Sequence, residues 1–170
     1  FKKEKKEKFN KYTDTLLLHI DPRQKYDTRS LIRFLSKAKK RKSTIDIGIS
    51  IYGENDIESA VYDVCDVVQL PVSVLDKTLL DSGFVESLKA KNLQIHSRSI
   101  FLQGVLLNDP KKLKNNLGSL SSAIAKFQAY CREKNYSALQ VCLNFVLSNS
   151  LLDFSVCGFN SYSELDQHMN

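Results

Sequence analysis

The feature that most constrains the fold is a repeated order of short apolar runs and longer segments with helical spacing. The apolar runs lie at residues 14–19, 45–49, 66–70, 94–98 and 153–157. The segment at 28–41 has apolar residues at positions 31, 32, 34, 35 and 38, which is the spacing of a helix face. Strands that alternate with helices predict parallel strands joined by crossover helices. The sequence therefore predicts an α/β protein built from five parallel strand–helix units.

The remaining helices are expected in the segments between these strands. They are predicted at about 1–11, 54–65, 79–92, 118–148 and 160–170.

Polar side chains close or follow four of the five apolar runs. They are His19, Ser50, Gln69 and Arg98. In an eight-stranded α/β barrel the carboxyl ends of the strands face one pocket, where the chemistry is carried out. One such residue is more often a loop residue or a satisfied hydrogen-bonding group, and that reading stays open for each of the four. Tyr52, Tyr62 and His96 are interpreted as packing, surface or structural residues.

Composition excludes several classes of protein. The net charge of +6 comes mainly from two lysine-rich segments without interleaved aromatic residues, so nucleic-acid binding is not expected. No apolar run approaches the ~20 residues that span a bilayer. The four cysteines form no metal-type spacing with histidine, which predicts no metal site. Three of them lie in apolar surroundings, which predicts reduced thiols and a reducing, cytoplasmic location. The chain also lacks the G-x-S-x-G motif of a serine hydrolase.

Several segments together resemble the aldo-keto reductase family. "DTLLLH", "IDIGIS" and "DVVQLPVSVLD" resemble the fourth, fifth and sixth barrel strands, the last as it occurs in the bacterial branch. "IHSRSIFLQGVLL" and "SVCGFNSYSELDQHM" resemble the seventh and eighth strands with the segments after them. The resemblance implies that residues 1–170 form a single partial (β/α)8 TIM barrel domain, whose first three units are not in this chain.

The resemblance also implies an NAD(P)-dependent oxidoreductase that transfers a hydride between NADPH or NADH and a small carbonyl or alcohol substrate. His19 would orient the carbonyl as the catalytic residue, and Ser50 and Gln69 would hold the nicotinamide carboxamide. Arg98 would either lie against the nicotinamide ring or point to the pyrophosphate. The remaining cofactor-binding residues implied are Ser99, Phe101, Gln103, Gly104, Gly158, Asn160, Glu164, Gln167 and His168.

The chain departs from the family pattern in two respects. The family's catalytic tyrosine, aspartate and lysine precede the histidine, and nothing in residues 1–170 matches them, so little turnover is expected of these residues alone. Where NADPH-preferring members carry basic residues, this chain has Glu164 and no Lys or Arg, so no strong preference for NADPH is expected. A non-catalytic half-barrel that acts as a scaffold or partner-binding module remains the alternative.

Overall fold

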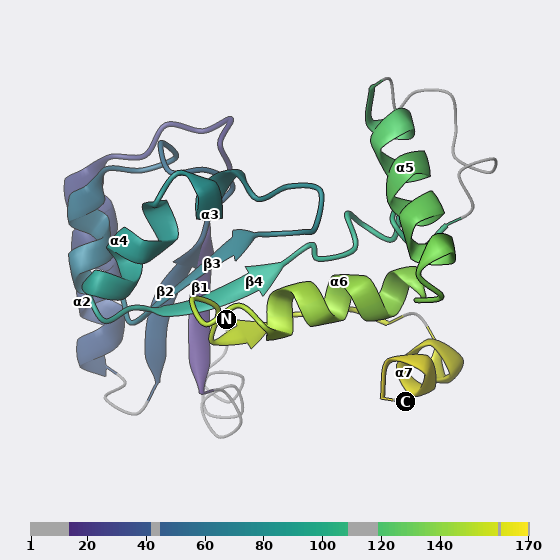
Figure 1. The fold of residues 1–170 in the computed structure, drawn as a ribbon. Helices are drawn as coiled ribbons and strands as arrows, with labels where there is room; N and C mark the ends of the chain where they lie inside the picture. The colour runs from purple at the N-terminus through teal and green to yellow at the C-terminus, as the bar shows by residue number, and fades with distance from the viewer. Residues whose placement is uncertain (1–13, 42–44, 109–118, 160, 170) are drawn as a thin grey trace. The chain divides into compact units, whose positions relative to one another are not determined.

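The computed structural model describes residues 14–41, 45–108, 119–159 and 161–169. The elements, in chain order, are β1 (Thr15–His19), α2 (Thr28–Arg41), β2 (Asp46–Ser50), the 3₁₀ helix η1 (Ser59–Val64), β3 (Val67–Pro71), α3 (Thr78–Asp81), α4 (Phe84–Ala90), β4 (Gln94–Arg98), α5 (Ser119–Glu133), α6 (Ala138–Leu147), β5 (Phe154–Ser155) and α7 (Tyr162–Met169) (Figure 1). The helix expected at 1–11 lies outside the described residues. Among the helices in the described ranges, none is long and apolar enough to cross a membrane.

The strands form one five-stranded sheet in the order β1-β2-β3-β4-β5. β1 pairs with β2, β2 with β3 and β4 with β5, and each of these pairs is parallel. Strands adjacent in sequence are therefore adjacent in the sheet, as in consecutive staves of a barrel. The predicted class, five parallel strands alternating with helices, is confirmed.

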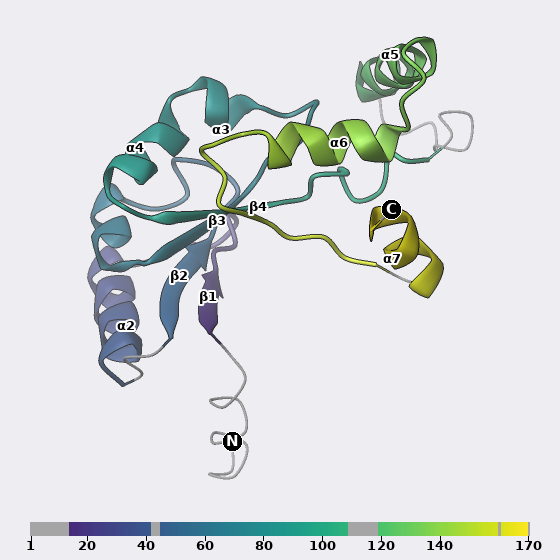
Figure 2. The same cartoon turned by 60° about the horizontal axis from the view of Figure 1, so that its bottom comes forward.

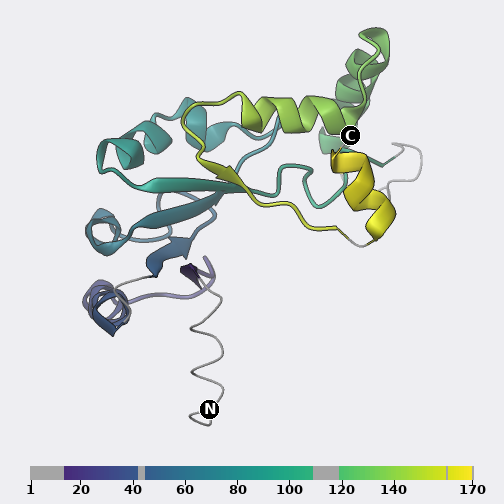
Figure 3. The ribbon, with the colours of Figure 1, turned by 90° about the horizontal axis from the view of Figure 1, so that it is seen from below.

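The chain divides into two compact units, Phe1–Leu70 with Gly83–Ile95, and Pro71–Ser82 with His96–Asn170. In the first unit, α2 and α4 lie on the same side of β1, β2 and β3 (Figures 2 and 3). The core of this unit includes buried side chains from α2, α4, β2 and β3. They are Leu31, Leu35, Ile47, Ile49, Val67, Val68, Val85 and Leu88.

In the second unit, α5 contacts α6 and α6 contacts β5. Its core joins the residues after β4 to these two helices. The buried side chains include Ile100, Leu106, Ile124, Phe127, Cys131, Cys142 and Val146.

Gly48 permits the close approach of β2 to β3. A Cβ atom at this position would lie 1.9 Å from the carbonyl oxygen of Val67 and 3.0 Å from Leu17 Cδ2. Side chains alternate between the two faces of a strand, so Gly48 shares a face with Ser50, while Ile47 and Ile49 lie on the other. The glycine therefore sets the strand spacing on the face that carries Ser50.

The structure corrects three predicted helices. The helix expected at 54–65 is only the 3₁₀ helix η1, because the Asp56 carboxylate accepts hydrogen bonds from the backbone N–H groups of Tyr52 (2.6 Å) and Gly53 (2.9 Å) and forms a turn there. The helix expected at 79–92 is divided into α3 and α4 at Gly83, which has a φ of 77°. The expected strand at 153–157 also shortens to Phe154–Ser155.

The third correction concerns the single helical stretch expected at 118–148, which is two helices. Asn135 adopts a left-handed φ of 56°, and the N–H of Tyr136 donates to the carbonyl of Cys131 at 2.9 Å, which is the Schellman pattern that ends a helix. α6 then begins with a capping box between Ser137 and Gln140.

Candidate functional site

Three of the predicted site residues form a row across the first unit. His19 is in register with Ser50, and Ser50 is in register with Gln69, so each residue lies beside the next on neighbouring parallel strands. The buried Ser50 hydroxyl donates a hydrogen bond of 2.9 Å to Gln69 Oε1. This bond fixes the orientation of the Gln69 amide, because its oxygen is held by Ser50 and its NH₂ group must point elsewhere.

Backbone hydrogen bonds hold the row in place just beyond the strand ends. The N–H of Ile20 donates to the carbonyl of Ser50 at 2.8 Å, and the N–H of Ile51 donates to the carbonyl of Gln69 at 2.9 Å. Ile20 and Ile51 are fully buried. The three polar side chains therefore stand on a packed and hydrogen-bonded base.

His19 is exposed and has an aromatic neighbour. The Tyr52 hydroxyl lies 3.4 Å from His19 Nε2, and the two rings meet edge to face with centroids 5.5 Å apart and an interplanar angle of 73°. Tyr52 is 47% exposed, so it lies at the surface, as expected from the sequence. Sequence reasoning missed its contact with the histidine.

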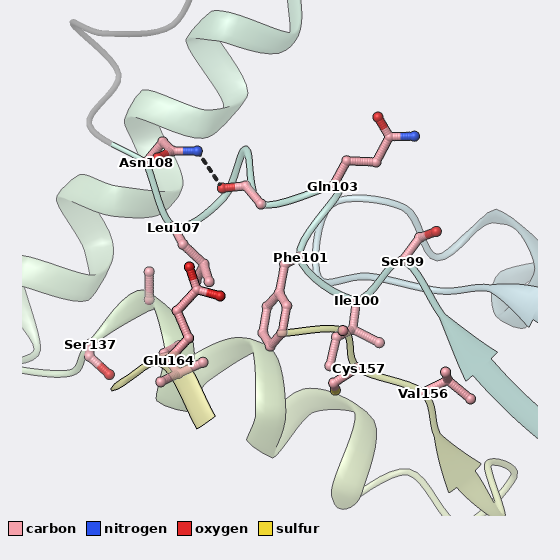
Figure 4. Close-up of a pocket in the computed structure, with 14 residues that line it drawn as sticks. Ser99, Ile100, Phe101, Gln103, Leu107, Asn108, Ser137, Val156, Cys157 and Glu164 are labelled. Atoms are coloured by element: carbon pink, nitrogen blue, oxygen red, sulfur yellow. Dashed lines mark hydrogen bonds between the residues drawn. The ribbon is translucent and has the colours of Figure 1, made fainter. Parts of the chain in front are cut away.

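The second unit contains a cavity of about 740 Å³, drawn in Figure 4. Its lining comes from the segment after β4, the start of α6, the segment after β5 and α7. Six of the predicted cofactor residues line it: Ser99, Phe101, Gln103, Gly104, Gly158 and Glu164. Arg98 adjoins this lining, because its Nη1 donates a hydrogen bond of 3.2 Å to the Ser99 hydroxyl.

The segment after β4 has an unusual backbone. Ser99, Leu102 and Gln103 have φ values of 58°, 45° and 56°, and Gly104 follows at 83°. Left-handed residues other than glycine are uncommon and cost about 1–3 kcal/mol each, so they persist only where neighbours hold them and are concentrated at functional sites. Here the Asn108 side chain donates to the carbonyl of Gly104 at 2.9 Å and supports the loop.

The cavity carries no lysine or arginine in its described lining. Its ionisable side chains are Glu164 and Cys157, and burial raises the pKa of the Cys157 thiol. Glu164 stands in the first turn of α7, where its backbone N–H donates to the Ser161 hydroxyl at 3.1 Å. Figure 4 shows the Glu164 side chain among those that line the cavity.

The cavity also includes residues that the sequence interpretation did not select. They are Ile100, Leu107, Asn108, Ser137, Ala138, Leu139, Val156 and Cys157. The Ser-x-x-Gln pattern at Ser137 is a signal for a helix start that the sequence interpretation did not use, and nothing in the sequence indicates that this helix end faces the segment after β4.

Three predicted residues cannot be placed in the same detail. Asn160 lies outside the described residues. Gln167 and His168 belong to α7, but their side chains lie outside the described part of the chain.

The other ionisable groups in the described part of the chain can be compared with the ligand sets of metal centres. Within the described ranges, no group of three or more His, Cys, Asp or Glu residues could hold a metal ion. His96 packs edge to face on Phe154, with centroids 5.1 Å apart. Tyr62 is buried against Phe84, and that burial raises the pKa of its phenol.

Comparison with known proteins gives one family. The model of the "Aldo/keto reductase family" matches residues 3–170. Among solved structures, the chain is similar to the aldo-keto reductase AKR11C1 from Bacillus halodurans in its apo form, with 17% sequence identity and a TM-score of 0.71. The similarity covers 92% of this chain but only 55% of the bacterial one, so the fold is a partial (β/α)8 barrel. No curated protein matches the sequence.

Proposed function

Since the chain belongs to the aldo/keto reductase family, we propose that the full-length protein is an NAD(P)-dependent oxidoreductase acting on a small carbonyl or alcohol substrate. When bound, the cofactor supplies or accepts a hydride at its nicotinamide ring. The observation that carries the proposal is the row of His19, Ser50 and Gln69 at the carboxyl ends of adjacent strands. In parallel α/β barrels this is the end at which active sites lie.

The Ser50–Gln69 pair suits a primary amide such as the nicotinamide carboxamide. A glutamine side chain offers two N–H donors and an oxygen acceptor, and a serine hydroxyl both donates and accepts. Ser50 holds the Gln69 oxygen at 2.9 Å. In this proposal the Gln69 NH₂ group therefore donates to the carboxamide oxygen, and the Ser50 oxygen accepts from the carboxamide nitrogen.

His19 is the catalytic residue of the proposal. Its exposed imidazole would donate a hydrogen bond to the substrate oxygen, which orients the carbonyl and stabilises the negative charge that develops on that oxygen. Arg98 would lie against the nicotinamide ring, and its hydrogen bond to Ser99 links it to the segment that lines the cavity.

We further propose that the cavity of the second unit holds the adenosine and diphosphate part of the cofactor. Its volume of about 740 Å³ falls in the usual range for small-molecule sites. Glu164 would accept hydrogen bonds from ribose hydroxyls and would repel a 2′-phosphate. Because the described lining has no cation for that phosphate, NADH should serve at least as well as NADPH.

Three wider expectations belong to the same proposal. Residues 1–170 would be one partial barrel domain that corresponds to the fourth to eighth units of a complete barrel of the bacterial branch. The protein would act in the cytoplasm without a metal ion. The catalytic tyrosine, aspartate and lysine would be contributed by chain outside residues 1–170.

The test is cofactor-dependent turnover by the full-length protein. Oxidation of NADH and NADPH is followed by absorbance with a panel of small aldehydes and ketones, for the wild type, H19A and a control, H96A. Loss of one oxyanion donor costs about 10²–10³-fold in kcat, and H19A should lose that much. H96A should keep its activity, because His96 lies two residues before Arg98, the last residue of β4, and packs on Phe154.

The opposite results are equally informative. If H19A turned over as fast as the wild type, the histidine would have no catalytic role. If the full-length protein bound nicotinamide cofactors but reduced no carbonyl, the non-catalytic scaffold would be the better description.

A further inference from the structure

Tyr52 makes a specific contact that its exposed position alone does not explain. It is the second residue after β2, and its hydroxyl oxygen lies 3.4 Å from His19 Nε2. The backbone N–H groups of Tyr52 and Gly53 both donate to one oxygen of Asp56, at 2.6 Å and 2.9 Å. This turn fixes the backbone from which the phenol reaches the imidazole.

We propose that Tyr52 is a positioning residue that holds the imidazole ring of His19 in one orientation; this inference rests on the proposed function of His19. A phenol hydroxyl both donates and accepts, so it can hydrogen-bond to Nε2 whether or not that nitrogen carries the proton. The contact of 3.4 Å therefore restrains the ring in either tautomer.

The proposed reaction needs this ring orientation with a proton on Nε2. A substrate carbonyl oxygen is only an acceptor, so it can be oriented by Nε2–H but not by an unprotonated Nε2. His19 and Tyr52 are both exposed, so a substrate oxygen can reach Nε2 and replace the phenol as its hydrogen-bond partner. Tyr52 thus orients the donor before the substrate arrives, and the edge-to-face ring contact restricts rotation of the imidazole.

The test uses the full-length protein, labelled with ¹⁵N at histidine, as the wild type, Y52F and Y130F. Y52F removes the hydroxyl and keeps the ring. Y130F removes the hydroxyl of a tyrosine that is 51% exposed on α5 and belongs to the other unit. The His19 signals are assigned by their loss in H19Q, and the ¹⁵N shifts are read at a pH where the ring is neutral.

We expect the His19 ring signals of Y130F to match those of the wild type, and the Nε2 signal to shift in Y52F, because Nε2 loses its hydrogen-bond partner. Y52F should also lower kcat roughly two- to tenfold without changing the KM for the cofactor, as the loss of one neutral hydrogen bond implies. Unchanged His19 shifts in Y52F would overturn the proposal whether or not the protein is active. Altered shifts with an unchanged kcat would overturn the positioning role.

Discussion

Replacing Gly48 by alanine should strongly destabilise the first unit. The added Cβ would lie 1.9 Å from the carbonyl oxygen of Val67 and 2.7 Å from its carbonyl carbon. Real Cβ atoms essentially never approach another heavy atom within 3.0 Å, and both of these atoms belong to backbone. Neither can turn away as a side chain would, so β2 and β3 must separate by roughly 1 Å from their usual spacing of about 4.8 Å.

The magnitude follows from what this separation disrupts. Two backbone hydrogen bonds join the strands close to the clash, from Asp66 N–H to the Ile47 carbonyl (2.7 Å) and from Ile51 N–H to the Gln69 carbonyl (2.9 Å). Each is worth about 0.5–1.5 kcal/mol, and overpacking adds about 1–3 kcal/mol. Alanine also lowers the conformational entropy of the unfolded chain, which offsets the loss of stability by about 0.4–1 kcal/mol. The free energy of unfolding should therefore fall by about 1–6 kcal/mol, with a central value of about 3 kcal/mol.

Urea unfolding followed by circular dichroism measures this change in the full-length protein. Gly53→Ala is the matched control, because the nearest atom to its new Cβ is Asp56 Oδ1 at 3.8 Å, an ordinary contact, and its unfolding free energy should stay within about 0.5 kcal/mol of the wild type. If G48A proved as stable as G53A, the close approach of β2 to β3 would not exist in solution. The spacing inferred for the Ser50–Gln69 pair would then be wrong as well.

Two further predictions concern the charge of the cavity and the buried thiols. Glu164→Arg should shift the ratio of kcat/KM for NADPH over NADH towards NADPH by about 10–150-fold, the equivalent of one charge-assisted hydrogen bond of 1.5–3 kcal/mol. Asp166→Arg, on the same helix but outside the cavity lining, should leave the ratio nearly unchanged, and equal shifts would disprove the role of Glu164. Burial raises the pKa of the Cys65 and Cys142 thiols from 9.0 to about 12, so the stability that each neutral thiol contributes is complete below pH 9 and is lost as the pH rises towards 12. Ionisation of each thiol in the unfolded chain should lower the unfolding free energy by about 1 kcal/mol by pH 10, and C142A should lose that much less than the wild type between pH 8 and 10.

The alternation of strands and helices is determined by the sequence itself. Apolar runs such as 45–49 and the helical spacing of 28–41 are local patterns, and a local pattern is enough to assign a strand or a helix and its buried face. The polar residues that close the strands are equally visible, because the parallel arrangement sends those ends to one edge of the sheet. The division of 118–148 also has a local signal, since Asn135 precedes a Ser-x-x-Gln pattern at Ser137–Gln140, although the sequence analysis predicted one helix there.

Contacts between distant segments were decided only by the tertiary structure. The hydrogen bond from Ser50 to Gln69 depends on the register of β2 against β3, and the contact of Tyr52 with His19 depends on the Asp56 turn. The tertiary structure likewise decides the left-handed residues after β4 and places Glu164 in a cavity with Ser99 and Gly158. The physical reason is that the spacing of apolar residues indicates only which side of a helix or strand is buried. A side-chain hydrogen bond requires atomic positions accurate to a few tenths of an ångström. Those positions are set by the packing of the whole unit.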